Sequence, residues 1–110
     1  MTIQDFELSV QRTINPALNN EQKFLNAVMG ISGESGELID QVKKFMFQGH
    51  ILDNHKLLQE GGDICYYLSL FAASKGVTLE HLMELNYNKL QKRYPNGFTI
   101  MDSINRRDKI

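Results

Sequence analysis

Several features are scarce in this sequence of 110 residues. Cysteine occurs only once, at Cys65, which excludes an internal disulfide and fits a reducing compartment. Eight glycines and two prolines are too few for a collagen-like or low-complexity chain. Apolar runs are short, and none approaches the roughly 20 residues that a membrane-spanning helix needs. These absences leave a globular domain as the expectation.

The charges disfavour a protein with a signal peptide and a protein that binds nucleic acid. The first ten residues, MTIQDFELSV, carry two acids where a signal peptide needs basic residues followed by an apolar stretch. We therefore expect a cytoplasmic protein that does not bind a membrane. Residues 1–85 carry eleven acids against six Lys and Arg, whereas residues 86–110 carry two against six. A stable nucleic-acid binder usually shows a broad basic excess, and this segregation suits a site for a metal and a phosphate better.

Helical periodicity dominates the chain. Apolar residues recur every three, four or seven positions, as on one face of a helix, and no strand pattern or internal repeat is found. We predict an all-α fold, a compact bundle of about four helices that forms a single domain over residues 1–110 with its core in about 20–98. The tail, 99–110, is expected to be extended or mobile. The predicted helices cover about residues 2–14, from Asn19 or Asn20 to near Gly49, from Asp53 or Asn54 to Lys75, and from Thr78 to about Arg93.

Glycines and acids interrupt the two central helices. Five glycines lie inside them, at positions 30, 33, 36, 61 and 62, and each costs about 1 kcal/mol relative to alanine. Close helix packing or a kink would explain one of them. Their acidic neighbours suggest more, because Glu34-Ser-Gly-Glu37 and Glu60-Gly-Gly-Asp63 form two matched patterns.

Each pattern places two acids three residues apart on one helix face, with Cβ atoms about 5–6 Å apart. If the two helices pack together, Glu34, Glu37, Glu60 and Asp63 converge, and a divalent cation is the obvious counter-charge. All four are oxygen donors, and none of the three histidines lies in either row. An oxygen-only set suits Mg²⁺, with Mn²⁺ as a possible substitute. Separately, each pair would be an ordinary solvated acidic surface.

A basic face ends the last predicted helix. Asn86, Lys89 and Arg93 lie at i, i+3 and i+7, so an amide and two cations share one side. Lys89 and Arg93 could bind phosphate oxygens, since Mg²⁺ commonly shares its ligand shell with substrate phosphates. A solvated basic helix end, favoured by the helix dipole, is the alternative.

Together these segments resemble the MazG-like all-α nucleoside triphosphate pyrophosphohydrolases, a superfamily that includes dimeric dUTPases and phosphoribosyl-ATP pyrophosphohydrolase. The likeness covers about residues 22–98. The motif Gly-x-x-x-Glu-x-x-Glu appears as Gly30 to Glu37, Glu-x-x-Asp as Glu60 to Asp63, and the Asn-x-x-Lys-Leu-x-x-Arg-Tyr-Pro-x-Gly-Phe ending as Asn86 to Phe98. Gln59 departs from the pattern, because many members have another acid there.

The resemblance implies Mg²⁺-dependent hydrolysis of a nucleoside triphosphate to the monophosphate and pyrophosphate. It assigns Glu34, Glu37, Glu60 and Asp63 to the metal, with Glu34 or Glu37 also orienting the attacking water. Lys89 and Arg93 would stabilise phosphate charge, and Asn86 would hydrogen-bond the substrate. No base-binding residue is evident; the aromatic side chains Phe24, Tyr66 and Tyr67 could stack on a base or belong to the core.

Two further expectations concern assembly and the alternative function. So small a chain with two long helices has few residues to cover both faces of those helices, and the resemblance agrees, so we expect a homodimer or homotetramer. The alternative to an enzyme is a helical subunit that binds a nucleotide or a protein without turnover.

Overall fold

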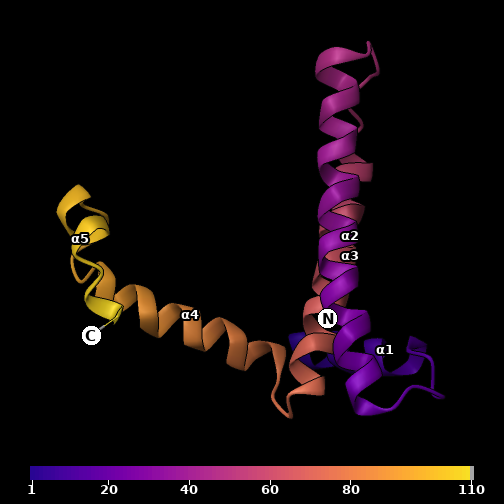
Figure 1. Cartoon of the computed structure of the whole chain (residues 1–110), viewed down its shortest axis with the longest axis horizontal. Helices are drawn as coiled ribbons and strands as arrows, with labels where there is room; N and C mark the ends of the chain where they lie inside the picture. Colours follow the sequence, from indigo (N-terminus) through magenta and orange to yellow (C-terminus); the bar gives the residue numbers. More distant parts are fainter. Residues whose placement is uncertain (110) are drawn as a thin grey trace. The chain divides into compact units, whose positions relative to one another are not determined.

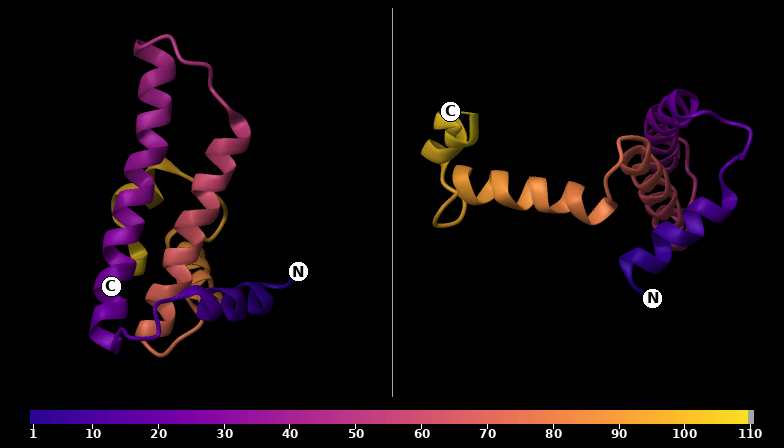
Figure 2. Two further views of the ribbon diagram at one scale, coloured as in Figure 1. Left: turned by 90° about the vertical axis from the view of Figure 1, so that its right-hand side faces the viewer. Right: turned by 90° about the horizontal axis from the view of Figure 1, so that it is seen from below.

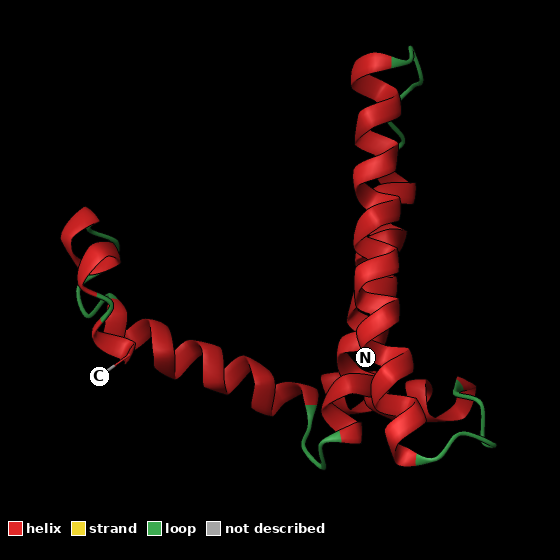
Figure 3. Cartoon of the chain, viewed as in Figure 1, coloured by secondary structure: helices red, strands yellow, loops and turns green. Residues whose placement is uncertain are grey.

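The structure is a computed structural model that describes residues 1–109, and within that range every named element is a helix (Figure 3). The predicted all-α class is confirmed. No described helix is both long and apolar enough to cross a membrane. The elements are α1 (Ile3–Thr13), α2 (Asn20–Phe47), α3 (Asn54–Ser74), α4 (Leu79–Arg93), α5 (Ile100–Asn105) and a short 3₁₀ helix, η1 (Arg107–Lys109).

The chain divides into two compact units. The hairpin unit comprises Met1–Leu79, and the C-terminal unit starts at Glu80. In the hairpin unit α2 and α3 run antiparallel and side by side, and α1 lies across the base of the pair, where α2 begins and α3 ends (Figures 1 and 2). The hairpin unit therefore contains both acidic motifs.

Local signals set the helix ends. Asn19 caps α2, its side chain accepting from the Gln22 backbone N–H while the Gln22 side chain accepts from the Asn19 N–H. Asp53 caps α3 through the N–H groups of the first turn. At the other end of α3, Gly76 adopts a positive φ of 73°, and Val77 N–H donates to Ala72 O, which closes a Schellman motif.

The core of the hairpin unit lies at its base. Val10, Ala27 and Leu70 are fully or almost fully buried, and side chains from α1 and α3 pack around them. Nearer the turn, α2 packs along α3, and Val42 and Phe45 are 38% and 46% exposed. The partly buried residues around the core are Phe6, Ile14, Tyr66, Tyr67 and Phe71.

The predicted tail, 99–110, is not extended where the structure describes it, because it contains α5 and η1; residue 110 lies outside the described residues. Thr99 caps α5 through the Asp102 N–H, and η1 follows. Arg93 Nε donates to Asp108 Oδ1 at 2.7 Å and Arg93 Nη2 to Asp108 Oδ2 at 2.9 Å. This bidentate pair fastens the end of the chain to the end of α4. A helix of six residues is too short to show a periodicity in the sequence.

Candidate active site

Three of the four predicted ligands come together. Glu34 and Glu37 extend from α2 and Glu60 from α3, and each offers a carboxylate oxygen within 4.8 Å of the others. The meeting follows from the fold, because α2 and α3 pack side by side. The structure therefore brings together three of the four acids that the i, i+3 spacing predicts to converge.

The carboxylates of this cluster are incompletely satisfied. Glu34 Oε2 and Glu60 Oε2 are buried and make no hydrogen bond to any described residue. Glu60 Oε1 accepts a long hydrogen bond, 3.5 Å, from Gln41 Nε2. Buried polar atoms without partners are costly and rare in folded proteins. A hard divalent cation would satisfy both oxygens, so the donor set fits Mg²⁺.

The electrostatics agree with this fit. The neighbouring Glu60 carboxylate, followed by burial and by the charges of Glu37 and Asp63, raises the pKa of Glu34 to about 7. Without a cation, the Glu34 carboxyl therefore holds its proton more tightly than an ordinary glutamate does, because the neighbouring negative charges disfavour its ionised form. A cation that takes the place of this proton would remove the repulsion.

Asp63, the fourth predicted ligand, is exposed and lies outside the group of three oxygens. Its charge nevertheless reaches the cluster, since it contributes to the raised pKa of Glu34. Its assignment as a ligand stays a prediction.

The five interior glycines differ in what surrounds them. A Cβ atom on Gly30 would collide with the ring of Tyr67, so close packing requires glycine there. At the other four, Gly33, Gly36, Gly61 and Gly62, an added Cβ would meet no atom within 4 Å. Packing therefore explains Gly30 alone, and the other four leave open space next to the acidic motifs.

The aromatic candidates for base stacking belong to the core. Tyr66 and Tyr67 pack edge to face with centroids 5.1 Å apart, and both contact the buried cluster. Tyr66 Oη also accepts a hydrogen bond from Thr13 Oγ1 at 2.9 Å. Phe24 lies 6.0 Å from Phe71 and beneath the ammonium group of Lys75.

The predicted phosphate-binding residues lie on α4. Asn86 and Lys89 are exposed, whereas the Arg93 side chain is 15% exposed and engaged by Asp108. This contact, the hydrogen bond first, raises the pKa of Arg93 and lowers that of Asp108 well below its usual range. Asn86, Lys89 and all but the first residue of α4 belong to the C-terminal unit, so their approach to the carboxylates is part of the proposal below.

Sequence reasoning missed two contacts. Gln41 follows Glu37 by four residues and so shares its helix face, which is a signal that could have found it. The partner of Arg93 had no such signal, because Asp108 lies fifteen residues away in a stretch without a helical period.

Comparison with known proteins then decides the family. Residues 22–98 match the MazG nucleotide pyrophosphohydrolase domain. The chain belongs to this family. The same segment contains both acidic motifs and the Asn86 to Phe98 ending, as the resemblance predicts.

One curated relative is also similar to this MazG-family chain. It is the Gene 37 protein of Mycobacterium phage L5, which is 36% identical over 73 residues. The match covers 63% of this chain and 64% of that protein, so it spans less than two thirds of the relative's length. No solved structure was found to match the chain.

Proposed function

We propose that this MazG-family chain hydrolyses a nucleoside triphosphate to the monophosphate and pyrophosphate with Mg²⁺. The observation that carries the proposal is the cluster of Glu34, Glu37 and Glu60, whose oxygens lie within 4.8 Å of one another and include two buried atoms without hydrogen-bond partners. Membership of a family of nucleotide pyrophosphohydrolase domains supports it.

In the proposed reaction a water oxygen attacks the α-phosphorus, and the bond to the β-phosphate bridging oxygen breaks so that pyrophosphate leaves. Glu34, Glu37, Glu60 and Asp63 would hold the cation, and Glu34 or Glu37 would orient the water and accept its proton. Bound Mg²⁺ would neutralise phosphate charge and lower the pKa of the water, and Mn²⁺ is a plausible substitute.

Residues of α4 complete the proposal. Lys89 stabilises phosphate charge and Asn86 hydrogen-bonds the substrate. Arg93 can contribute while it remains paired, because a guanidinium has five N–H donors and Asp108 engages only Nε and Nη2.

We further propose that the active form is a homodimer or homotetramer. The distal half of α2 presents an apolar groove of about 500 Å³ lined by Leu38, Ile39, Val42, Lys43, Met46 and Phe47. Ile39, Met46 and Phe47 are 68%, 64% and 76% exposed, and a unit with so few fully buried apolar residues gains stability by covering such a surface. We propose a second copy of this chain as the partner.

Pyrophosphate release from a panel of canonical and modified nucleoside triphosphates, with and without MgCl₂, tests the function. We expect Mg²⁺-dependent release that Glu60→Gln abolishes, while Glu21→Gln, an exposed acid outside the cluster, retains it. Saturable nucleotide binding without product would instead indicate the non-catalytic subunit.

A further inference from the structure

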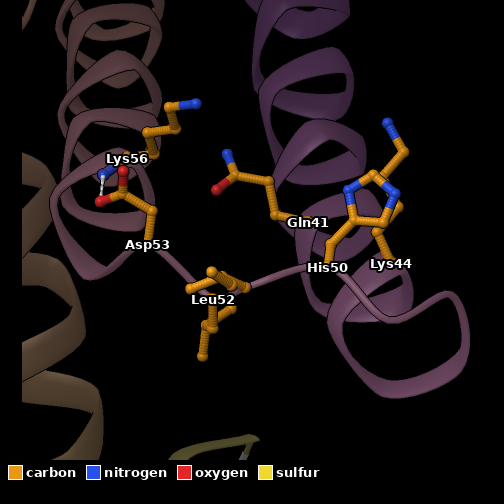
Figure 4. A pocket seen from close by; sticks show the side chains of 7 residues that line it. Gln41, Lys44, His50, Leu52, Asp53 and Lys56 are labelled. Atoms are coloured by element: carbon orange, nitrogen blue, oxygen red, sulfur yellow. Dashed lines mark hydrogen bonds between the residues drawn. The ribbon is translucent and has the colours of Figure 1, made fainter.

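A cavity lies at the turn between α2 and α3, apart from the carboxylate cluster. Its volume is about 190 Å³, and its walls include Gln41, Lys44, His50, Asp53 and Lys56. Figure 4 shows Lys56 on the α3 side, Lys44 and His50 on the α2 side, and Gln41 between them. Two lysines, one from each helix, therefore line an opening that is large enough for a small anion.

The charges in this cavity favour an anion over a cation. Asp53 is the single acid in its wall, and its Oδ1 accepts the N–H groups of His55 and Lys56 as the α3 cap. Lys44 Nζ lies 2.9 Å from Asp40 Oδ2 and, with three N–H donors, can bind a further oxygen. The Lys56 ammonium makes no ion pair within 4.0 Å of a carboxylate in the described part of the chain, 1–109.

Gln41 connects this cavity to the carboxylates. Its side chain lines the cavity while its Nε2 donates to Glu60 Oε1. On α2, Glu37, Gln41 and Lys44 are spaced i, i+4 and i+7, and on α3 Lys56 precedes Glu60 by four residues. Along the helices, Lys56 thus lies about one turn, roughly 5.4 Å, from Glu60, and Lys44 lies about two turns from Glu37. An extended polyphosphate could reach from one group to the other.

We propose that the cavity binds the terminal phosphates of a polyphosphate chain, with Lys44 and Lys56 as its charge partners and Gln41 as the link to the carboxylates. The inference rests on the proposed function in that it places the β- and γ-phosphates, the pyrophosphate to be released, in this cavity. It also assigns the hairpin unit its own phosphate-binding cations.

The test measures inorganic pyrophosphate binding to the full chain by calorimetry in EDTA, so that no metal contributes. Lys56→Gln and Lys44→Gln should each raise the Kd by about 10-fold, the effect of losing one charge-assisted contact. Lys43→Gln is the matched control, because Lys43 pairs with the same Asp40 but does not line the cavity. An unchanged melting temperature of each variant checks its folding.

The proposal would be overturned by a lack of pyrophosphate binding to the wild type, by unchanged binding in both cavity variants, or by equal weakening in Lys43→Gln. Competition separates the possible ligands, since a nucleoside triphosphate should displace pyrophosphate and a nucleoside monophosphate should not. Displacement by the monophosphate at equal concentration would also overturn it.

Kinetics separate this proposal from the proposed function. If the wild type hydrolyses a nucleotide and both Lys56→Gln and Lys43→Gln do so with the wild-type kcat and KM, the cavity proposal is overturned and the proposed function stands. Pyrophosphate binding through Lys44 and Lys56 in a protein that hydrolyses no nucleotide would support the cavity and overturn the function.

Discussion

At the scale of single residues, Gly30 and Gly33 differ in what they face although they lie one turn apart on α2. The ring of Tyr67 occupies the space next to Gly30, whereas the space next to Gly33 is open. Gly30→Ala should lower the free energy of unfolding by about 1–3 kcal/mol through overpacking. Gly33→Ala should raise it by up to about 1 kcal/mol through helix propensity.

Urea unfolding of the two variants measures the difference, with each as the control for the other. Destabilisation of similar size in both would mean that backbone conformation, and not the contact with Tyr67, requires the glycines. Activity lost in a stabilised Gly33→Ala protein would indicate that a ligand uses the open space.

Glu34 gives a pH dependence. Its pKa is about 7 in the folded protein against 4.5 in the unfolded chain, so the folded state binds the proton more tightly. The resulting stabilisation is fully present below pH 4.5 and is lost as the pH rises through about 7. In EDTA, the melting temperature of the wild type should fall between about pH 5 and pH 8.

Glu34→Gln is the matched control for this fall, because it removes the titrating group with little change of shape. Its melting temperature should vary less over the same range. Saturating MgCl₂ should also flatten the wild-type profile, since the cation replaces the proton. Parallel profiles for wild type and variant in EDTA would contradict the raised pKa.

At the scale of elements, the sequence predicted the four long helices because their caps act locally. Asn19 and Asp53 bond to the N–H groups of the turn that follows each of them, and Gly76 ends α3 where a left-handed residue is needed. The short α5 was not predicted, because its six residues are too few to show a helical period.

In the candidate site, too, local sequence signals predict some features and not others. Glu34, Glu37 and Glu60 could be predicted from i, i+3 spacing on two helices that pack together. The cavity at the α2–α3 turn could not, because it depends on how the turn folds back beside Gln41. Spacing within one helix carries no information about that geometry.

The Arg93–Asp108 pair gives a prediction for α5 and η1. Asp108→Asn should accelerate amide hydrogen exchange across residues 100–109, because the Asp108 side chain is only 2% exposed and its charge holds the segment against α4. The lowered pKa of Asp108 means that this stabilisation is present above the usual carboxyl pKa and is lost as the pH falls below it.

Arg107→Gln is the control, since the Arg107–Asp102 pair is longer, 3.5 Å, and the Arg107 side chain is 54% exposed. Surface pairs of this kind contribute about 0–1 kcal/mol. Exchange that is equally fast in both variants would show that the bidentate geometry at Asp108 gives no special stability.

At the scale of the whole molecule, the apolar groove on α2 predicts the oligomeric state. Met46→Glu should shift the protein toward monomer in light scattering at micromolar concentration, because a charge in a covered apolar interface is costly. Leu58→Glu is the control, since Leu58 is 75% exposed and lies outside the groove. An active wild type with the mass of a single chain would contradict the proposed oligomer.

The uneven burial along the hairpin unit has a consequence for its motions. Val10, Ala27 and Leu70 are buried at the base, whereas residues toward the turn, such as Ile51 and Leu58, are 94% and 75% exposed. Local unfolding of the two long helices should therefore start at the turn, with opening free energies that rise toward the base. Amide protection factors should increase along α3 from Asn54 to Ser74. A ligand that joins the lysines of the turn to the carboxylates would stabilise the least stable end of the hairpin unit. Nucleotide should therefore slow amide hydrogen exchange most near the turn, where the free protein opens first.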